Sequence, residues 1–103
     1  MPTIVADAPE SSALVRDEAF GPLVTLARVA SPDVALARIN ASAYGLTGAV
    51  FARDAALAAR MLRQLSVGTA YWNTCERTHA AMPWTGRRHS GCVCVCVCVC
   101  AFT

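Results

Sequence analysis

A carboxylate and an aromatic ring stand two positions apart in residues 17–22, which read Asp-Glu-Ala-Phe-Gly-Pro. An ionised carboxylate such as that of Glu18 can accept hydrogen bonds from two adjacent hydroxyl groups, for example those of a ribose. An aromatic ring such as that of Phe20 can pack against a flat heterocycle. The alternative is a plain turn, in which Gly21 and Pro22 break the chain, Glu18 is solvated and Phe20 packs. Physical chemistry alone leaves both interpretations open.

A second group of chemically active side chains follows the apolar run 69–72. Residues 73–91 contain Thr74, Cys75, Glu76, Thr78, His79 and Trp84. The plainest interpretation of His79 and His89 is exposed loop histidines, and a lone cysteine is an inert thiol unless a base and a geometry activate it. The chain has no C-x-x-C, H-E-x-x-H, phosphate-loop or G-x-G-x-x-G pattern. No metal site is therefore expected.

The segments around these side chains are predicted to form alternating strands and helices. Four β-branched or apolar runs bounded by turn residues predict strands at 3–6, 23–29, 47–52 and 69–72. Two helices are predicted, one begun by Ser31-Pro32-Asp33 and ending near 40–42, the other capped by Asp54 and covering 55–65. Residues 11–17 have room for one or two helical turns. We expect a turn at 44–45 and a long loop over 73–91.

This order predicts an α/β fold, a partial and mostly parallel sheet with covering helices. Two strand–helix–strand units are expected, over 23–52 and 47–72, each with a right-handed crossover. Ligands bind at the loops that follow the carboxyl ends of parallel strands. The loop after residue 72 is such a place.

Composition narrows the class of protein. The 103 residues include 55% hydrophobic and 16% charged residues, against roughly 25% charged in typical chains, so disorder of the whole chain is not expected. The nine basic residues are all arginine and are scattered, which argues against nucleic-acid binding. The amino terminus lacks the pattern of a secretory signal, and the uncharged stretch 90–103 is too short to cross a bilayer. We expect a cytosolic protein.

Four segments together resemble the NAD(P)-dependent aldehyde dehydrogenase family. Residues 18–22 resemble its E-x-F-G-P motif, and residues 40–46 resemble its N-x-S-x-Y-G-L motif. Residues 68–73 are similar to its G-x-v-x-v-N strand, and residues 83–86 with 90–91 are similar to its P-F-G-G…S-G loop. The resemblance covers residues 2–91. It corresponds to the C-terminal part of the family's catalytic domain.

The resemblance implies an activity and a set of contacts. In the family a cysteine thiolate attacks an aldehyde, NAD or NADP accepts a hydride, and a glutamate-activated water releases the carboxylic acid. The resemblance assigns Glu18 to the nicotinamide-side ribose and Phe20 to the nicotinamide. It assigns Trp84 to the aldehyde pocket, together with Thr74 and Thr78. It supplies no counterpart of the nucleophile or the general base in this chain, and Cys75 lies in the wrong place to be that nucleophile.

A low-complexity tract follows this region. Residues 92–100 alternate Cys and Val without interruption, where the family continues into a helix and an interface strand. In an extended strand the five thiols would share one side, which suits a soft metal ion or an aggregating segment. The plainest interpretation is a tail with no selected role. We therefore expect an aldehyde dehydrogenase region over 1–91 and a tail over 92–103 outside the fold.

The leading functional hypothesis is a fragment of an aldehyde-oxidising enzyme that is inactive by itself. In the complete enzyme the expected substrate is an aldehyde, the expected coenzyme is NAD or NADP, and the expected assembly is a homo-oligomer. Two alternatives stay open. One is a non-catalytic piece that docks on full-length subunits. The other is a thiol-rich protein that binds metal through the tract at 92–100.

Overall fold

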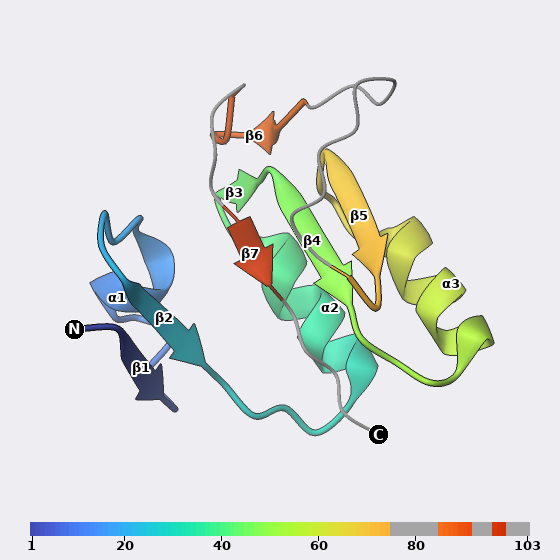
Figure 1. Ribbon diagram of the computed structural model, residues 1–103, viewed down its shortest axis with the longest axis horizontal. Coiled ribbons are helices and arrows are strands. Elements are labelled where there is room, and N and C mark those ends of the chain that lie inside the picture. Colours follow the sequence, from blue (N-terminus) through green and yellow to red (C-terminus); the bar gives the residue numbers. More distant parts are fainter. Residues whose placement is uncertain (75–84, 92–95, 99–103) are drawn as a thin grey trace. The chain divides into compact units, whose positions relative to one another are not determined.

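The computed structural model describes residues 1–74 and 85–91, together with the backbone of 96–98. The chain forms two compact units, Met1–Ala30 and Ser31–Thr103 (Figure 1). Among the described residues the first unit has one sheet and the second unit has two, and we describe each unit by itself. Among the described residues, no helix has the length and apolar character needed to cross a membrane.

The first unit is a two-stranded parallel sheet with one short helix. Strand β1 (Thr3–Ala6) pairs in parallel with β2 (Leu23–Leu26), so that Thr3 lies opposite Leu23 and Ala6 lies opposite Leu26. Helix α1 (Ala13–Arg16) connects them, and Ser12 caps it by accepting a hydrogen bond from Leu14 N. Strand β2 ends at Leu26 rather than at the expected residue 29, because β1 offers no partner beyond Ala6.

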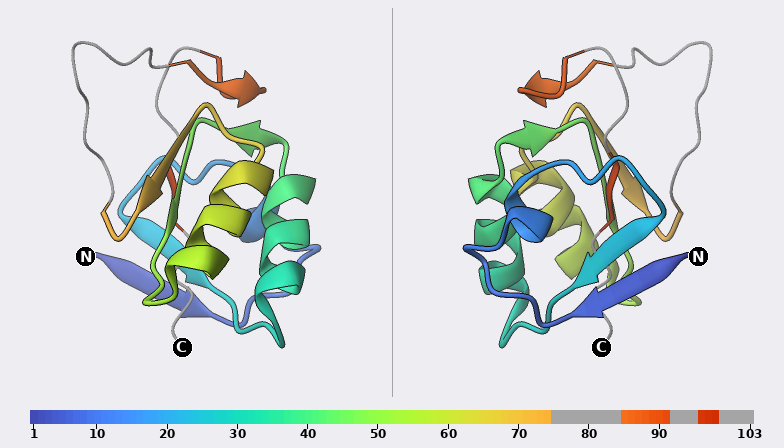
Figure 2. Two further views of the ribbon diagram at one scale, coloured as in Figure 1. Left: turned by 90° about the vertical axis from the view of Figure 1, so that its right-hand side faces the viewer. Right: turned by 90° about the vertical axis from the view of Figure 1, so that its left-hand side faces the viewer.

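The second unit is a sheet covered by two helices on one face (Figure 2). Helix α2 (Pro32–Ala41) and helix α3 (Ala55–Gln64) pack beside β4 (Thr47–Val50) and β5 (Thr69–Trp72). Strands β4 and β5 are parallel neighbours joined through α3, as the sequence predicts for residues 47–72. The predicted caps are confirmed: Ser31 Oγ accepts from Val34 N, and Asp54 Oδ1 accepts from Ala56 N and Leu57 N.

The core of this unit lies between α3, α2 and the sheet. Met61 and Val50 are each 1% exposed, and Ala58 is fully buried. Met61 and Leu65 are buried, and Leu57 and Leu62 pack against this core, so α3 turns an apolar stripe toward the sheet. Burial of these side chains is the main source of stability in a unit of this size.

Two small strands differ from the sequence expectation. Tyr44–Gly45, expected as a turn, forms β3, and Arg87–Arg88, expected within a loop, forms β6. The two strands pair antiparallel, with Tyr44 opposite Arg88 and Gly45 opposite Arg87. A two-residue pair made across more than forty residues has no periodicity that a sequence pattern can display.

The strand pairing is described within each unit. Among the described residues, β2 pairs only with β1, whereas β4 pairs with β5 and β7. The parallel pairing expected between the strands of residues 23–52 would join the two units, and it stays a prediction. The predicted order of four strands and two helices along the chain is confirmed, with further short elements between and after them. The fold is α/β, with small and mostly parallel sheets.

The Cys-Val tract was expected to lie outside the fold, and three of its residues differ from that expectation. Cys96–Cys98 form β7, which pairs in parallel with β4, with Cys96 opposite Thr47 and Cys98 opposite Ala49. The physical reason is that β4 would otherwise present an open edge, and β-branched valine favours extended backbone. For the rest of residues 92–103 the expectation stays a prediction.

Candidate functional site

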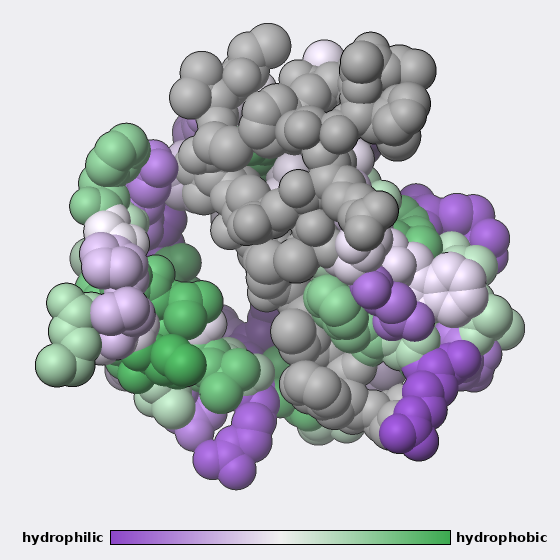
Figure 3. Space-filling view, in the orientation of Figure 1, coloured by the Kyte–Doolittle hydropathy of each residue, from purple (hydrophilic) through white to green (hydrophobic). Residues whose placement is uncertain are grey.

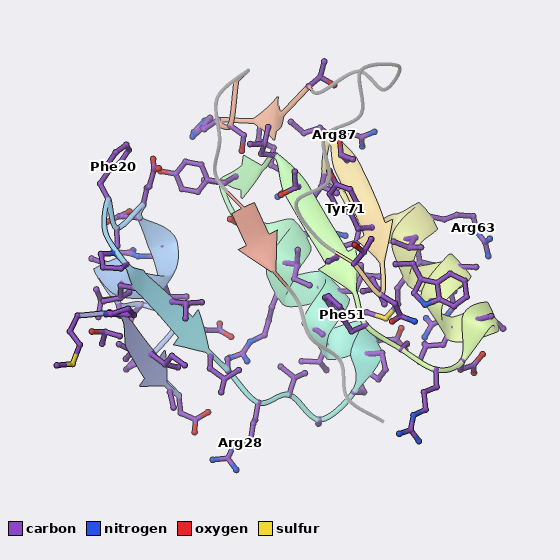
Figure 4. The ribbon with its side chains drawn as sticks, in the orientation of Figure 1. Phe20, Arg28, Phe51, Arg63, Tyr71 and Arg87 are labelled. Atoms are coloured by element: carbon purple, nitrogen blue, oxygen red, sulfur yellow. The ribbon has the colours of Figure 1, made fainter. Side chains whose placement is uncertain are left out.

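The segment between α1 and β2 presents Glu18 and Phe20 to solvent. Glu18 is exposed, and Phe20 is 98% exposed. The Phe20 ring extends away from the ribbon of its unit (Figure 4). The plain-turn interpretation requires Phe20 to pack, and the ring does not pack among the described residues. The contact of Phe20 with a ligand stays a prediction.

Backbone hydrogen bonds define the path of this segment on both sides of Glu18 and Phe20. Asp17 N donates to Ala13 O at 2.8 Å, and Gly21 N donates to Ala19 O at 2.7 Å. Leu23 N donates to Gly21 O at 2.8 Å where the chain enters β2. Short turns on both sides therefore hold Glu18 and Phe20 at defined positions. A carboxylate so placed can accept hydrogen bonds from two neighbouring hydroxyls without first paying to order its backbone.

The second predicted site begins where β5 ends. Asn73 has a left-handed backbone (φ 52°), and its side-chain amide hydrogen-bonds to the backbone of Ala52, just beyond β4. Its Oδ1 accepts from Ala52 N at 2.9 Å, and its Nδ2 donates to Ala52 O at 3.1 Å. Trp72 Nε1 donates to the same carbonyl at 3.1 Å. These bonds fix the direction in which the chain leaves β5, and Thr74, half-buried, is the first residue beyond them.

The remaining pocket residues of the sequence analysis lie outside the described residues. Thr78 and Trp84 are among them, as are Cys75 and His79. Their roles stay predictions. Glu18 and Phe20 lie in the first unit and Thr74 lies in the second, so each group is described only within its own unit.

Within the second unit, Ser90 binds the segment 85–91 to β3. Ser90 is 6% exposed, and its Oγ accepts a hydrogen bond from Gly45 N at 2.7 Å. Arg88, with a left-handed backbone (φ 57°), donates from its guanidinium to Ser42 O. At Gly68 a Cβ would lie 1.5 Å from Thr85 O, so only glycine admits this approach. Thr85 thus lies directly against Gly68, the residue before β5, while Arg88 and Ser90 bind back to residues 42–45.

Sequence reasoning gave no role to the segment 40–46, and the structure assigns it a positioning one. Asn40 Nδ2 donates to Gln64 O at 2.8 Å, and its Oδ1 accepts from Ser66 N at 2.8 Å. This single amide satisfies backbone groups on both sides of the end of α3, which helices otherwise leave without partners. The asparagine of the N-x-S-x-Y-G-L match was the available signal, but the pattern does not show what the side chain binds.

No group of three or more metal-ligating side chains occurs in the part of the chain that the structure describes. The candidate site comprises the exposed Glu18 and Phe20 in the first unit. In the second unit it comprises the loop ends that Asn73 and Ser90 bind to the backbone.

The sequence profile of the aldehyde dehydrogenase family matches residues 1–93. This chain belongs to the aldehyde dehydrogenase family. The match includes the loop with Glu18 and Phe20, both helices of the second unit and the anchored segment 85–91.

Relatives of known structure and known name agree with this assignment. Aldehyde dehydrogenase [NAD(P)+] 2 of Saccharomyces cerevisiae is 40% identical over 90 residues, which are 87% of this chain and 18% of that protein. Betaine aldehyde dehydrogenase of Staphylococcus aureus, solved in complex with NAD+, is 36% identical with a TM-score of 0.82. An aldehyde dehydrogenase of Bacillus cereus is 30% identical with a TM-score of 0.84. Both structures cover 87% of this chain.

The aldehyde dehydrogenase chains that it matches are much longer. This chain spans 18% of the length of the yeast enzyme and 18% of each of the two solved chains. The shared backbone at 30% and 36% identity nevertheless shows that the described elements have the family's fold.

Proposed function

We propose that this chain is the C-terminal part of an aldehyde dehydrogenase catalytic domain, and that it contributes coenzyme and substrate contacts to the oxidation of an aldehyde to a carboxylic acid. The observation that carries the proposal is the full exposure of Phe20 beside an exposed Glu18, in a segment that matches the family. The cytosolic location expected from the sequence and a homo-oligomeric assembly belong to the same proposal.

The residues fit NAD or NADP. Glu18 offers two carboxylate oxygens with no hydrogen-bond or ion-pair partner among the described residues, so both are available to the vicinal hydroxyls of a ribose. Phe20 offers a bare ring face to the adjoining heterocycle. When bound, the dinucleotide supplies the hydride-accepting step. The part of Glu18 and Phe20 is to orient that dinucleotide, which is a matter of positioning rather than of bond making.

The anchored loop supplies the substrate side. Thr74 leaves a strand end that Asn73 fixes, and residues 85–91 are bound back to Gly45 and Gly68. The proposal places Thr74, Thr78 and Trp84 along the aldehyde pocket. The chain alone is expected to be inactive, because the proposal assigns the attacking thiolate and the general base to the rest of the enzyme.

The test is a chimera in which residues of this chain replace the 90 matching residues of the yeast enzyme. In that chimera Glu18→Gln keeps the size of the side chain and removes its charge, and we expect the KM for the coenzyme to rise about tenfold, the loss of roughly one charge-assisted hydrogen bond. Asp17→Asn is the matched control, since it removes the same charge from the neighbouring exposed residue and should leave the KM unchanged. An unchanged KM and kcat in Glu18→Gln would refute the coenzyme role.

A further inference from the structure

Ser90 is the buried residue of a segment that otherwise faces solvent. Within 85–91, Gly86 is half-buried and the remaining residues are exposed, whereas Ser90 is 6% exposed. Among the described residues, the other buried polar side chains are Thr47 and Thr69, which belong to β4 and β5. Hydrophilic side chains lie instead at the surface over α3 (Figure 3). Burial of a hydroxyl is costly unless it is hydrogen-bonded, so the bond that Ser90 makes is a condition of its burial.

The hydroxyl of Ser90 belongs to a closed series of contacts within the second unit. Its Oγ accepts a hydrogen bond from Gly45 N at 2.7 Å, and Gly45 O in turn accepts one from Gly68 N at 2.9 Å. Thr85 O lies so close to Gly68 that a Cβ at that position would be 1.5 Å from it. The contacts thus lead from one end of the segment 85–91, through β3 and the residue before β5, to the other end.

The segment is also closed on itself. Gly86 N donates to Gly91 O at 2.9 Å, and Ser90 N donates to Arg87 O at 3.3 Å. A Cβ at Gly86 would lie 2.2 Å from Gly91 O and 2.9 Å from Ser90 Cβ, so the two ends of the segment are in close contact. A shift of Ser90 away from β3 would therefore displace Gly86 and, with it, the preceding Thr85.

The bonds of Arg88 to the same strand are of another kind. Its guanidinium donates to Ser42 O and, at 3.4 Å, to Tyr44 O, and Arg88 is exposed. Water can take the place of an exposed donor. Gly45 is buried, so removal of the Ser90 hydroxyl would leave the Gly45 N–H without a partner and away from water, which is the costly case. Ser90 therefore makes a contact that solvent does not replace.

We propose that Ser90 is a positioning residue for the aldehyde side of the active site, whose hydroxyl fixes where Thr85 lies and thereby sets the affinity for the aldehyde. The inference rests on the proposed function, which assigns Trp84, the residue before Thr85 in the sequence, to the aldehyde pocket. Ser90 itself transfers no proton and contacts no substrate. It acts through the backbone that it holds against Gly45.

The experiment uses the chimera described above, with acetaldehyde as the substrate. Ser90→Ala removes the oxygen to which Gly45 N donates and adds no atoms. We expect the KM for acetaldehyde to rise about tenfold and the KM for the coenzyme to stay unchanged, because a small displacement weakens only the contacts that depend on it. Ser31→Ala is the matched control, since its Oγ also accepts from a backbone N–H, that of Val34, but at the start of α2.

The two Michaelis constants separate positioning from a general loss of stability. A rise in the KM for acetaldehyde alone, in Ser90→Ala but not in Ser31→Ala, supports the proposal. An unchanged KM for acetaldehyde, equal rises for aldehyde and coenzyme, or the same rise in Ser31→Ala would overturn it. The coenzyme role fails by a different result, a KM for the coenzyme that Glu18→Gln leaves unchanged, so the two failures are distinguishable.

Hydrogen exchange on the full chain gives a second readout that needs no activity. In Ser90→Ala the Gly45 amide should exchange about tenfold faster, because it has lost its acceptor, while the amides of β4 keep their rates. Ser31→Ala should leave the Gly45 amide as it is. A Gly45 rate that Ser90→Ala does not change, or an equal acceleration of Gly45 and β4, would overturn the proposal.

Discussion

The two units of this chain solve the problem of stability in opposite ways. The second unit, Ser31–Thr103, buries Met61, Val50 and Ala58 between its helices and sheet. The first unit, Met1–Ala30, buries no residue at all and keeps its strands together by backbone hydrogen bonds. The comparison teaches that the unit that presents Glu18 and Phe20 is held by backbone pairing and short turns, whereas the unit that anchors the loop has an apolar core of its own.

The largest effect should come from the core of the second unit. Met61→Ala removes a side chain that is 1% exposed and leaves a cavity, so the free energy of unfolding should fall by about 3 kcal/mol. Leu14→Ala, at 42% exposure on α1, is the control and should change it by less than about 0.5 kcal/mol. Urea unfolding followed by circular dichroism measures both. Equal losses would remove the contrast between the units.

A pair of glycines gives the next largest effect. A Cβ at Gly68 would lie 1.5 Å from Thr85 O, whereas one at Gly21 would have no atom within 4 Å. Gly68→Ala should therefore destabilise the second unit by about 2 kcal/mol through forced backbone movement, and Gly21→Ala should be close to neutral. The same urea titration compares them. A neutral Gly68→Ala would show that residues 85–91 are not bound against β5.

A smaller effect is expected at the end of α3. Asn40→Ala removes the donor to Gln64 O and the acceptor for Ser66 N, which should cost about 1.5 kcal/mol. Hydrogen exchange gives the local readout, because the Ser66 amide should exchange faster while the amides of β1 keep their rates. If exchange accelerates equally in both units, they do not unfold separately.

The smallest effect is expected in the first unit. Asp7→Asn breaks the ion pair with Arg28. The side chain of Asp7 is 54% exposed and that of Arg28 is 89% exposed. Solvent and salt already screen such a pair, so the loss should not exceed about 0.5 kcal/mol and should vanish at high salt. A loss of stability as large as that of Asn40→Ala would mean that this pair holds the unit together.

Local signals predicted most of the elements. Ser31 and Asp54 predict the starts of α2 and α3. A helix start favours a side chain that accepts a hydrogen bond from a backbone N–H two or three residues further along the chain, and this signal is visible in the sequence. The strands β1, β4 and β5 follow in the same way from short β-branched runs. Long-range pairings were not predictable. The contact of Tyr44 with Arg88 joins segments that share no pattern, and β2 shows nothing in its residues that selects β1 over β4.

The candidate site was predictable to a different degree in each unit. The types and spacing of Glu18 and Phe20 predicted a ligand contact as one interpretation and a plain turn as the other. The structure shows that both side chains are exposed, and the ligand contact stays a prediction. Asn40, Asn73 and Ser90 were missed because each acts through one backbone group far away in the chain. A side chain that binds a distant backbone group produces no periodic pattern in the sequence.

The double anchorage around β5 has a practical consequence for exchanging the segment between the two anchors. Asn73 fixes the exit of that strand, and the approach of Thr85 to Gly68 fixes a point beside its entrance. Residues 75–84 are thus strung between two points that belong to the helix-covered unit. Engineers can exchange this decapeptide for that of another aldehyde dehydrogenase and leave both attachment points, and the folded scaffold beneath them, as they are.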